Sequence, residues 1–160
     1  MNKPNITIYT DGSSKGNPGR GGYGMVLISG KYRKEFSEGY RKTTNNRMEL
    51  LSVIVALEML KVEGSDVTVY TDSKYVSDAV NKRWIYNWFN KNFKKVKNPD
   101  LWQRFLDIYS KHDVKFIWIK GHAENVENNR CDYLATEAAM QDNLKIDEFY
   151  ENFNNIEKLF

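Results

Sequence analysis

The chain has 160 residues, of which 41% are hydrophobic and 28% are charged, with a net charge of +3. These values predict one soluble globular domain with a sizeable core and exclude a disordered chain. The longest apolar run, residues 50–57, is too short to span a bilayer, and the first ten residues lack the apolar region of a signal peptide. We therefore expect a cytoplasmic protein without a membrane partner. The single cysteine excludes an intramolecular disulfide and agrees with a reducing compartment.

The first part of the chain predicts three strands followed by a helix. The turn-rich residues 11–22 and the turn at Gly30 separate the strands, and such short connections favour an antiparallel meander. From Asn46, apolar residues recur at helical spacing until Gly64 closes the segment. The three predicted strands cover residues 5–10, 23–29 and 32–41.

The second part alternates strands with helices. Strands that are separated by helices can run parallel through right-handed crossovers. We therefore predict an α/β protein with a mixed five-stranded sheet, in which the first three strands are antiparallel, strands one, four and five are parallel, and helices flank the sheet. The predicted strands cover 67–71 and 114–120, and the predicted helices cover 73–80, 82–97, 98–112 and 127–141.

An aspartate follows the same kind of strand twice, in ITIYTDGS and in VTVYTDSK. If these strands are parallel neighbours, Asp11 and Asp72 lie side by side at the carboxyl end of the sheet. The alternative is that each is an ordinary turn or helix-capping residue. Glu49 and Asp132 stand on helices rich in apolar residues, and each taken alone could be a solvated helix acid. Four converging carboxylates would need cations, and oxygen ligands suit Mg²⁺ or Mn²⁺.

Five motifs follow one another between residues 5 and 141: YTDGSSKGNPGRGGYG, TTNNRMEL, YTDSKYV, DLWQR and IKGHAENVENNRCDYLA. Together they resemble the bacterial type 1 ribonuclease H family. The resemblance implies a ribonuclease H-like fold and hydrolysis of the RNA strand of an RNA/DNA hybrid, leaving 5′-phosphate and 3′-hydroxyl ends. It also implies two divalent ions, Mg²⁺ or Mn²⁺, in each active site with substrate bound. We expect the protein to be a monomer.

The resemblance assigns catalytic roles to residues of this chain. It makes Asp11, Glu49, Asp72 and Asp132 the metal-binding acids. His122 matches a family histidine that shuttles a proton or helps to release product, which a pKa near neutrality permits. The alternative for His122 is an ordinary histidine in a surface loop.

Contacts to the hybrid follow from the same resemblance. Asn17, Asn45 and Asn46 match residues that sense 2′-hydroxyls, although turn and capping chemistry is an alternative role. Lys74 stands where the family often has glutamine, and a lysine cannot accept a hydrogen bond from a 2′-hydroxyl, so the contact there stays open. A pocket for a DNA phosphate is implied at Lys42, Thr44 and Asn98.

Residues 82–97 hold six lysines or arginines and no acid, with aromatic residues between them. This composition predicts a polyanionic partner, and the resemblance makes the segment a basic protrusion that holds the DNA strand. We treat Trp84 as core or mixed, because it recurs with Trp88 on one helical face. The contacts to DNA are predicted at Trp88, Lys91, Phe93, Lys94 and Lys95.

The end of the chain has its own pattern. We predict a catalytic domain over residues 1–142 and a C-terminal extension over 143–160. An amphipathic helix docked on the same domain is one interpretation of the extension, and a tail that binds a protein partner is the other. The apolar residues at helical spacing are Ile146, Phe149, Tyr150, Phe153, Ile156 and either Leu159 or Phe160.

Two other functions belong to different classes. A non-catalytic module that binds hybrids on the same fold would tolerate the loss of a metal-binding acid, and all four acids are present. A DNA-cutting relative, such as an integrase or transposase catalytic domain, carries an acidic triad but is not expected to show the TTNNRMEL and KGHA segments. The motifs therefore favour the ribonuclease H function.

Overall fold

The computed structural model describes residues 3–121 and 125–159, and for residues 154–159 it describes the backbone alone. The strands of this part are β1 (Asn5–Lys15), β2 (Gly19–Ser29), β3 (Tyr32–Thr43), β4 (Asp66–Thr71) and β5 (Asp113–Trp118). Its helices are α1 (Asn45–Glu58), α2 (Lys74–Asn81), α3 (Trp84–Asn90), α4 (Pro99–Tyr109), α5 (Val126–Ala139) and α6 (Glu148–Leu159). Within this part, no helix has both the length and the apolar character needed to cross a membrane.

The strands form one mixed sheet in the order β3-β2-β1-β4-β5. The pairs β1–β2 and β2–β3 are antiparallel, whereas β1–β4 and β4–β5 are parallel. The predicted α/β fold with a mixed five-stranded sheet is confirmed.

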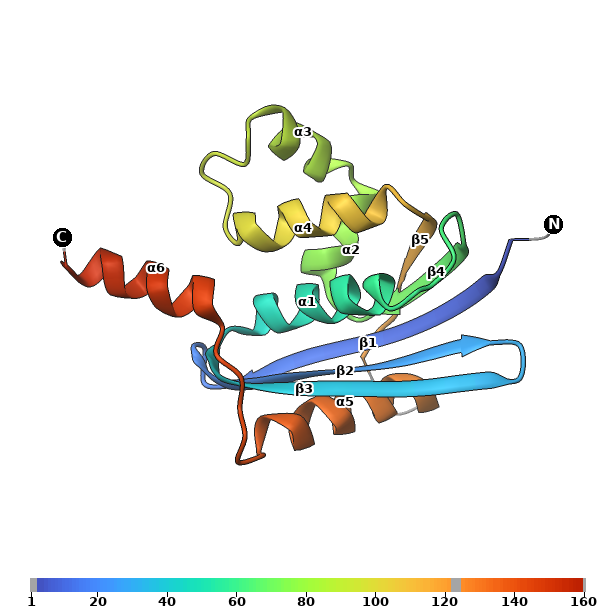
Figure 1. Cartoon of the computed structure of the whole chain (residues 1–160), viewed down its shortest axis with the longest axis horizontal. Coiled ribbons are helices and arrows are strands. Elements are labelled where there is room, and N and C mark those ends of the chain that lie inside the picture. Colours follow the sequence, from blue (N-terminus) through green and yellow to red (C-terminus); the bar gives the residue numbers. More distant parts are fainter. Residues whose placement is uncertain (1–2, 122–124, 160) are drawn as a thin grey trace.

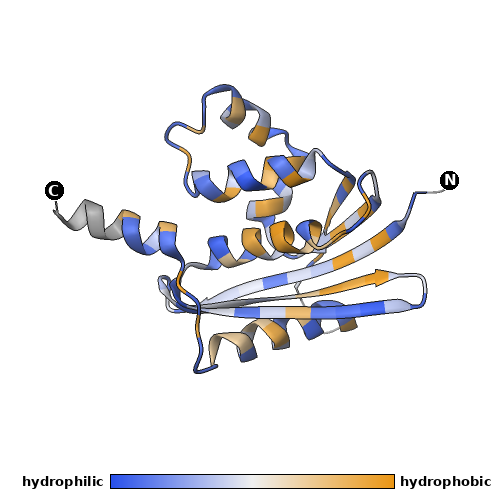
Figure 2. Ribbon diagram, in the orientation of Figure 1, coloured by the Kyte–Doolittle hydropathy of each residue, from blue (hydrophilic) through white to orange (hydrophobic). Residues whose placement is uncertain are grey.

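Helices cover both faces of this sheet (Figure 1). Helices α1 and α4 lie over one face, and α5 packs against β1, β2 and β3 on the other. Figure 2 shows that hydrophobic residues concentrate in α1 and in the elements packed around it. The largest fully buried side chains include Trp102 and Phe105 of α4, Met48 of α1 and Ile8 of β1. Most of α1 is buried because the helix lies between the sheet and α4.

The hairpin between β1 and β2 differs from the prediction. Residues 11–22 were expected to form a turn, but β1 continues to Lys15 and β2 already begins at Gly19. The glycines of this region serve helix packing more than turning. A Cβ on Gly22 or Gly24 would collide with the backbone of α5, so the helix can approach β2 only where side chains are absent.

The basic segment is helical only over α3. The expected helix over 82–97 ends at Asn90, and the chain continues as an irregular loop to Asn98. Left-handed backbone conformations explain the end of the helix, because residues with positive φ cannot continue it. They occur at Asn92, Phe93, Lys95 and Asn98.

The extension 143–160 forms a shorter helix than predicted, since α6 begins only at Glu148. Ahead of it, Lys145 pairs with the edge strand β3. Its N–H donates to Gly39 O at 2.9 Å, and its carbonyl accepts from Arg41 N–H at 2.9 Å. Arg41 also forms an ion pair with Glu151 of α6 at 2.9 Å. These contacts attach the extension to β3, and the domain boundary at residue 142 stays a prediction.

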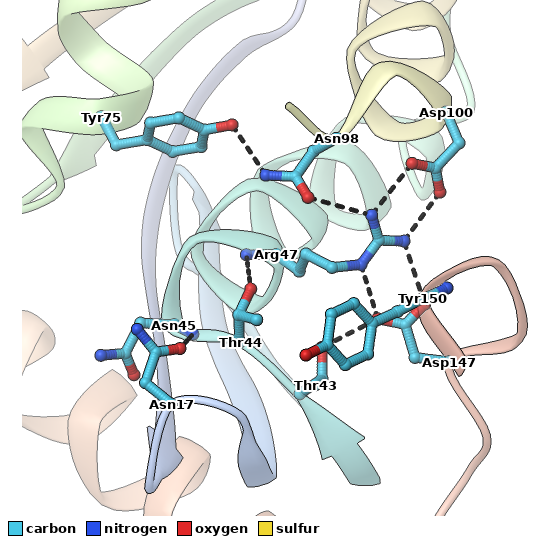
Figure 3. A network of polar contacts seen from close by, with 10 residues as sticks. All are labelled: Asn17, Thr43, Thr44, Asn45, Arg47, Tyr75, Asn98, Asp100, Asp147 and Tyr150. Carbon is cyan, nitrogen blue, oxygen red and sulfur yellow. Dashed lines mark hydrogen bonds and ion pairs between the residues drawn. The ribbon is translucent and has the colours of Figure 1, made fainter. Parts of the chain in front are cut away.

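A buried network around Arg47 ties the extension to α1 (Figure 3). The Arg47 Nε donates to Asp147 Oδ2 at 2.6 Å, and Nη2 donates to Asp100 Oδ2 at 2.7 Å. Thr43 Oγ1 also donates to Asp147 Oδ2, at 2.8 Å. The side chain of Arg47 is only 3% exposed, so its charge is balanced almost entirely by these two carboxylates.

Candidate active site

Three carboxylates meet where β1 and β4 run side by side. The parallel register pairs Tyr9 with Tyr70, and Asp11 and Asp72 each lie two residues further along their chain segments. Glu49 reaches the same place from the first turns of α1. One carboxylate oxygen from each of the three acids lies within 4.8 Å of the others. The structure therefore brings together three of the four acids that the sequence pointed to.

Gly12 explains how α1 comes so close to β1. A Cβ at this position would collide with the backbone of Met48 and Glu49, so only glycine fits. The Gly12 N–H donates to Glu49 Oε1 at 2.5 Å and fixes the direction of that carboxylate. Main-chain packing and one hydrogen bond thus place Glu49 next to Asp11.

The environment of these acids favours their protonated forms in the absence of a cation. Burial, with repulsion from Asp72 and Asp132, raises the pKa of Asp11 to about 7, although a hydrogen bond with Glu49 opposes the shift. Burial and the charge of Asp11 raise the pKa of Glu49 well above its usual value. Burial, and then the charge of Asp132, also raise the pKa of Asp72. The three groups therefore repel one another when they are all ionised.

Asp132, the fourth acid, lies on α5 and is exposed. Its charge acts on both Asp11 and Asp72, so it belongs to the same electrostatic neighbourhood. His122 lies outside the described residues. The preceding Gly121 is close to this site, because a Cβ there would meet the carboxylate of Asp72.

The donor set fits a hard divalent cation. Among the described residues, no lysine or arginine forms an ion pair with Asp11, Glu49 or Asp72. Buried like charges without a counter-ion are unfavourable, and carboxylate oxygens are the ligands that Mg²⁺ and Mn²⁺ prefer. The site offers oxygen ligands alone and includes neither cysteine nor a described histidine.

Polar residues at the start of α1 lie beside this site. Thr44 is the N-cap and accepts from Arg47 N–H at 3.2 Å. Asn17 Oδ1 accepts from Asn45 N–H at 3.1 Å, and Asn45 Oδ1 accepts from Ser14 N–H at 2.6 Å. The capping and turn roles that were the alternative for the asparagines are thus present for Asn17 and Asn45. Asn46 is exposed.

The other residues that the resemblance assigned to substrate contacts are Asn98, Lys74 and Lys42. Asn98 donates from Nδ2 to Tyr75 Oη at 2.9 Å and accepts at Oδ1 from Arg47 Nη1 at 3.2 Å. The Nζ of Lys74 lies 4.8 Å from the ring centroid of Trp118, whose Nε1 donates to the main-chain oxygen of Asp72. Lys42 is exposed.

The aromatic residues of the basic segment are placed differently from the prediction. Trp84, expected to be core or mixed, is 43% exposed. Trp88 instead packs edge-on against Trp102, with ring centroids 5.2 Å apart, and Phe93 is buried. The reason is the break after α3, since the loop turns Phe93 inward. The exposed residues of the predicted DNA contact are Lys91, Lys94 and Lys95.

Two features near the start of α1 were not predicted from the sequence. The buried ion pairs of Arg47 join residues that lie far apart in the chain, and no local pattern indicates such a pairing. The second is a cleft of about 790 Å³ between the start of α1, the loop before α4 and α6. Its lining includes Asn17, Thr44, Asn46 and Asn98, together with aromatic residues of α6.

A mixed sheet that gathers acidic side chains beside two parallel strands defines an α/β protein with a carboxylate centre for cations. The family model described as RNase H matches residues 3–140. The chain therefore belongs to the ribonuclease H family, as the motifs indicated, and is an enzyme of that class.

Relatives and solved structures agree with this membership. Ribonuclease H of Rippkaea orientalis is 52% identical over 152 residues, which cover 92% of this chain and 93% of the relative. Ribonuclease H of Syntrophus aciditrophicus is 52% identical over 91% of this chain and 86% of the relative. The crystal structure of LC9-RNase H1, a type 1 RNase H with the type 2 active-site motif, aligns with a TM-score of 0.79 and 31% identity over 87% of this chain and 74% of that one. LC11-RNase H1, solved in complex with RNA/DNA hybrid, aligns with a TM-score of 0.61 and 29% identity over 84% of this chain and 96% of that one.

Proposed function

We propose that this protein hydrolyses the RNA strand of RNA/DNA hybrids with two divalent metal ions, leaving 5′-phosphate and 3′-hydroxyl ends. The observation that carries the proposal is the cluster of Asp11, Glu49 and Asp72, whose carboxylate oxygens lie within 4.8 Å of one another. Carboxylates that lie this close together without a basic partner repel one another. Such a group is suited to binding cations rather than to stabilising the fold.

Each acid has a role in this proposal. Asp11 and Glu49 hold the cations from β1 and α1, Asp72 binds them from the end of β4, and Asp132 adds a further carboxylate from α5. Two bound divalent ions supply Lewis-acid stabilisation of the attacking and leaving oxygens in an in-line displacement. The Gly12 hydrogen bond keeps the Glu49 carboxylate turned toward Asp11.

His122 completes the proposal as a group that moves a proton or assists product release. In the sequence it directly follows Gly121, which lies against Asp72. We expect His122→Ala to lower turnover while cation binding, measured by calorimetry, is retained. Unchanged turnover would remove His122 from the mechanism.

The substrate assignment rests on chemistry that suits a nucleic acid duplex. Exposed Lys91, Lys94 and Lys95 supply positive charge for phosphates, and Asn46, three residues before Glu49 on α1, presents an exposed amide. A relative on the same fold, LC11-RNase H1, has been solved in complex with RNA/DNA hybrid. These features support a hybrid as the substrate of this chain.

The decisive experiment compares three end-labelled substrates: RNA/DNA hybrid, duplex DNA and duplex RNA. With Mg²⁺ we expect internal cleavage of the RNA strand of the hybrid alone, and with EDTA no cleavage. Asp72→Asn keeps the size of the side chain but removes its charge, so it should bind the hybrid without cutting it. Cleavage in EDTA, or cleavage of duplex DNA, would refute the proposed function.

A further inference from the structure

The cleft beside α6, whose lining includes Thr44 and Asn98 of the expected pocket for a DNA phosphate, has two unlike walls. One wall is α6, which contributes Phe149, Tyr150 and Phe153. The opposite wall is the loop before α4, which contributes Lys95 and Lys97. In Figure 1, α6 and this loop lie on the same side of the molecule, beyond the start of α1. The volume of about 790 Å³ is large enough for a polymer segment rather than an ion.

The α6 wall presents an exposed aromatic surface. The rings of Phe149 and Phe153 are nearly parallel, at 10° with centroids 6.0 Å apart. They are 41% and 50% exposed, respectively. If the helix served only to cover the protein's own core, these rings would be the residues to bury, and they are not.

The opposite wall carries charge without partners in the protein. Lys95 and Lys97 are exposed, and within the described residues neither forms an ion pair. Unpaired lysines facing aromatic rings are the combination that proteins use along a nucleic-acid strand, where the cations meet phosphates and the rings meet sugars or bases.

The cleft is lined by residues of the same elements that carry the acids. Asn46, which lines the cleft, precedes Glu49 by three residues on α1, so about one helical turn, roughly 5 Å, separates them along the helix axis. Asn17, also in the lining, belongs to the same β1–β2 hairpin as Asp11. Asn46 and Asn17 therefore connect the lining of the cleft to the elements that carry the acids.

The position of α6 is set by buried contacts rather than by a free tail. Asp147 stands one residue before the helix and is held by Arg47 and Thr43. Arg47 also lies over the ring of Phe149, 5.4 Å from its centroid. The aromatic wall is thus anchored to α1, the helix that also carries Glu49, which favours a role at the active site over the docking of a separate protein.

An aromatic wall also distinguishes the two strands of a hybrid. Phenylalanine has no group that can hydrogen-bond a 2′-hydroxyl, and burying that hydroxyl without a partner is unfavourable. Deoxyribose has no such group and can pack against the ring. We propose that α6 forms one wall of a subsite for the DNA strand of the hybrid, with Phe149 and Phe153 against its sugars and Lys95 and Lys97 at its phosphates. This inference rests on the proposed function.

The test measures binding of RNA/DNA hybrid and of duplex RNA in EDTA, where no cleavage is expected. The variants are Phe153→Ala and the double variant Phe149→Ala with Phe153→Ala. We expect the double variant to bind the hybrid about tenfold more weakly, in the range for loss of aromatic contacts to a nucleic-acid strand, with a smaller loss for Phe153→Ala. In cleavage assays the effect should appear as a higher KM. Binding of duplex RNA should change less than binding of the hybrid.

Tyr32→Ala is the matched control, because Tyr32 is a 71% exposed aromatic residue at the β2–β3 turn, away from the cleft. Hybrid affinity equal to that of Tyr32→Ala in both α6 variants would overturn the inference. An equal loss for hybrid and duplex RNA would overturn the assignment to the DNA strand. Loss confined to the double variant, with a lowered Tm, would reduce α6 to a structural element and also overturn it. If the unmodified protein binds the hybrid but cuts nothing in Mg²⁺, the proposed function fails separately.

Discussion

Two clusters of buried charge begin on the same turn of α1 and differ in how their charges are balanced. Arg47 points into one cluster and is surrounded by Asp147 and Asp100, with both ion pairs at 2.7 Å or less. Glu49, two residues later, points into the other, where its neighbours are the acids Asp11 and Asp72. In the first cluster the protein supplies both signs of charge, whereas no described lysine or arginine pairs with the acids of the second.

This difference separates a structural site from a functional one. Opposite charges that satisfy one another stabilise a particular packing, and removal of one member leaves the others buried and unpaired. Like charges held together by main-chain contacts weaken the fold unless a ligand offsets their repulsion. We therefore expect variants in the two clusters to change the stability of the metal-free protein in opposite directions.

The largest effect is expected from Asp11→Asn. The amide keeps the shape of the side chain but removes a charge that would hold the cation, so we expect cleavage of hybrid to fall on the order of 10³-fold. Steady-state cleavage with Mg²⁺ measures this loss. In EDTA the same variant should unfold at a higher temperature than the unmodified chain, because one repelling charge is gone. Lower stability in EDTA would contradict the proposed contrast between the clusters.

Arg47→Met should lower the stability of the fold, whereas Asp11→Asn should raise it in EDTA. The change leaves Asp147 and Asp100 without their cation, and we expect the free energy of unfolding to fall by about 3 kcal/mol. Denaturant unfolding monitored by circular dichroism measures this. Arg104→Met is the matched control, since the side chain of Arg104 is 46% exposed in its pair with Glu58 and its loss should cost less than about 1 kcal/mol. If both variants lost a similar free energy of unfolding, the buried Arg47 network would stabilise the fold no more than an exposed ion pair does.

The stability of the metal-free protein should depend on pH through the acidic cluster. Burial raises the pKa of Asp11 from 3.8 to about 7, so the folded protein holds a proton that the unfolded chain has released. This contribution to stability is complete below pH 3.8 and is lost as the pH rises through about 7. In EDTA we expect the free energy of unfolding to decrease by on the order of 2 kcal/mol between about pH 5 and 8.

Asp11→Asn is the control for this pH dependence. Burial lowers the pKa of His112, which gives a contribution of the opposite sign that both proteins share. The difference between the two stability profiles therefore isolates Asp11 and its neighbours. Added Mg²⁺ should flatten the profile of the unmodified chain, because a bound cation favours the ionised acids. Identical profiles for the two proteins would exclude the raised pKa as their source.

The smallest effect is expected at the surface, where charge is neither buried nor balanced. Reversing Lys94 and Lys95 to glutamate should weaken hybrid binding several-fold and lower the slope of log K against log salt by roughly 0.9 for each phosphate that is no longer neutralised. Fluorescence anisotropy at several salt concentrations measures both quantities. The matched control reverses Lys31 and Lys34, which are exposed near the β2–β3 turn. An unchanged slope would remove Lys94 and Lys95 from the interface.

Local patterns were sufficient to predict the strand directions and, for neighbouring parallel strands, the meeting of Asp11 with Asp72. Both aspartates follow sequence runs of alternating polarity, and a parallel pairing of such runs brings equivalent positions together. Glu49 could be suspected because its helical neighbours are apolar. Its exact direction depends on Gly12, whose lack of a side chain matters only once α1 lies against β1.

The failures of prediction share a tertiary cause. Gly22 was expected in a turn, yet it lies within β2, where α5 needs a surface without side chains. Trp84 and Trp88 have helical spacing, but the position of Trp102 decides which of them packs inside. The partner of Arg47 in the C-terminal extension is separated from it by a hundred residues. Local sequence patterns do not indicate pairings between residues so far apart in the chain.

The contact at Gly12 has a consequence for which cation can enter. Because the β1 backbone lies directly against α1, the main-chain spacing between residues 11 and 49 cannot widen unless a strand moves against a helix. Mg²⁺ requires short bonds in near-ideal octahedral geometry, whereas Ca²⁺ takes more ligands at longer distances. A pair of carboxylates with fixed separation discriminates between ions by radius. In the proposed metal site, the absence of a methyl-sized group at residue 12 would therefore bear on metal selectivity as well as on packing.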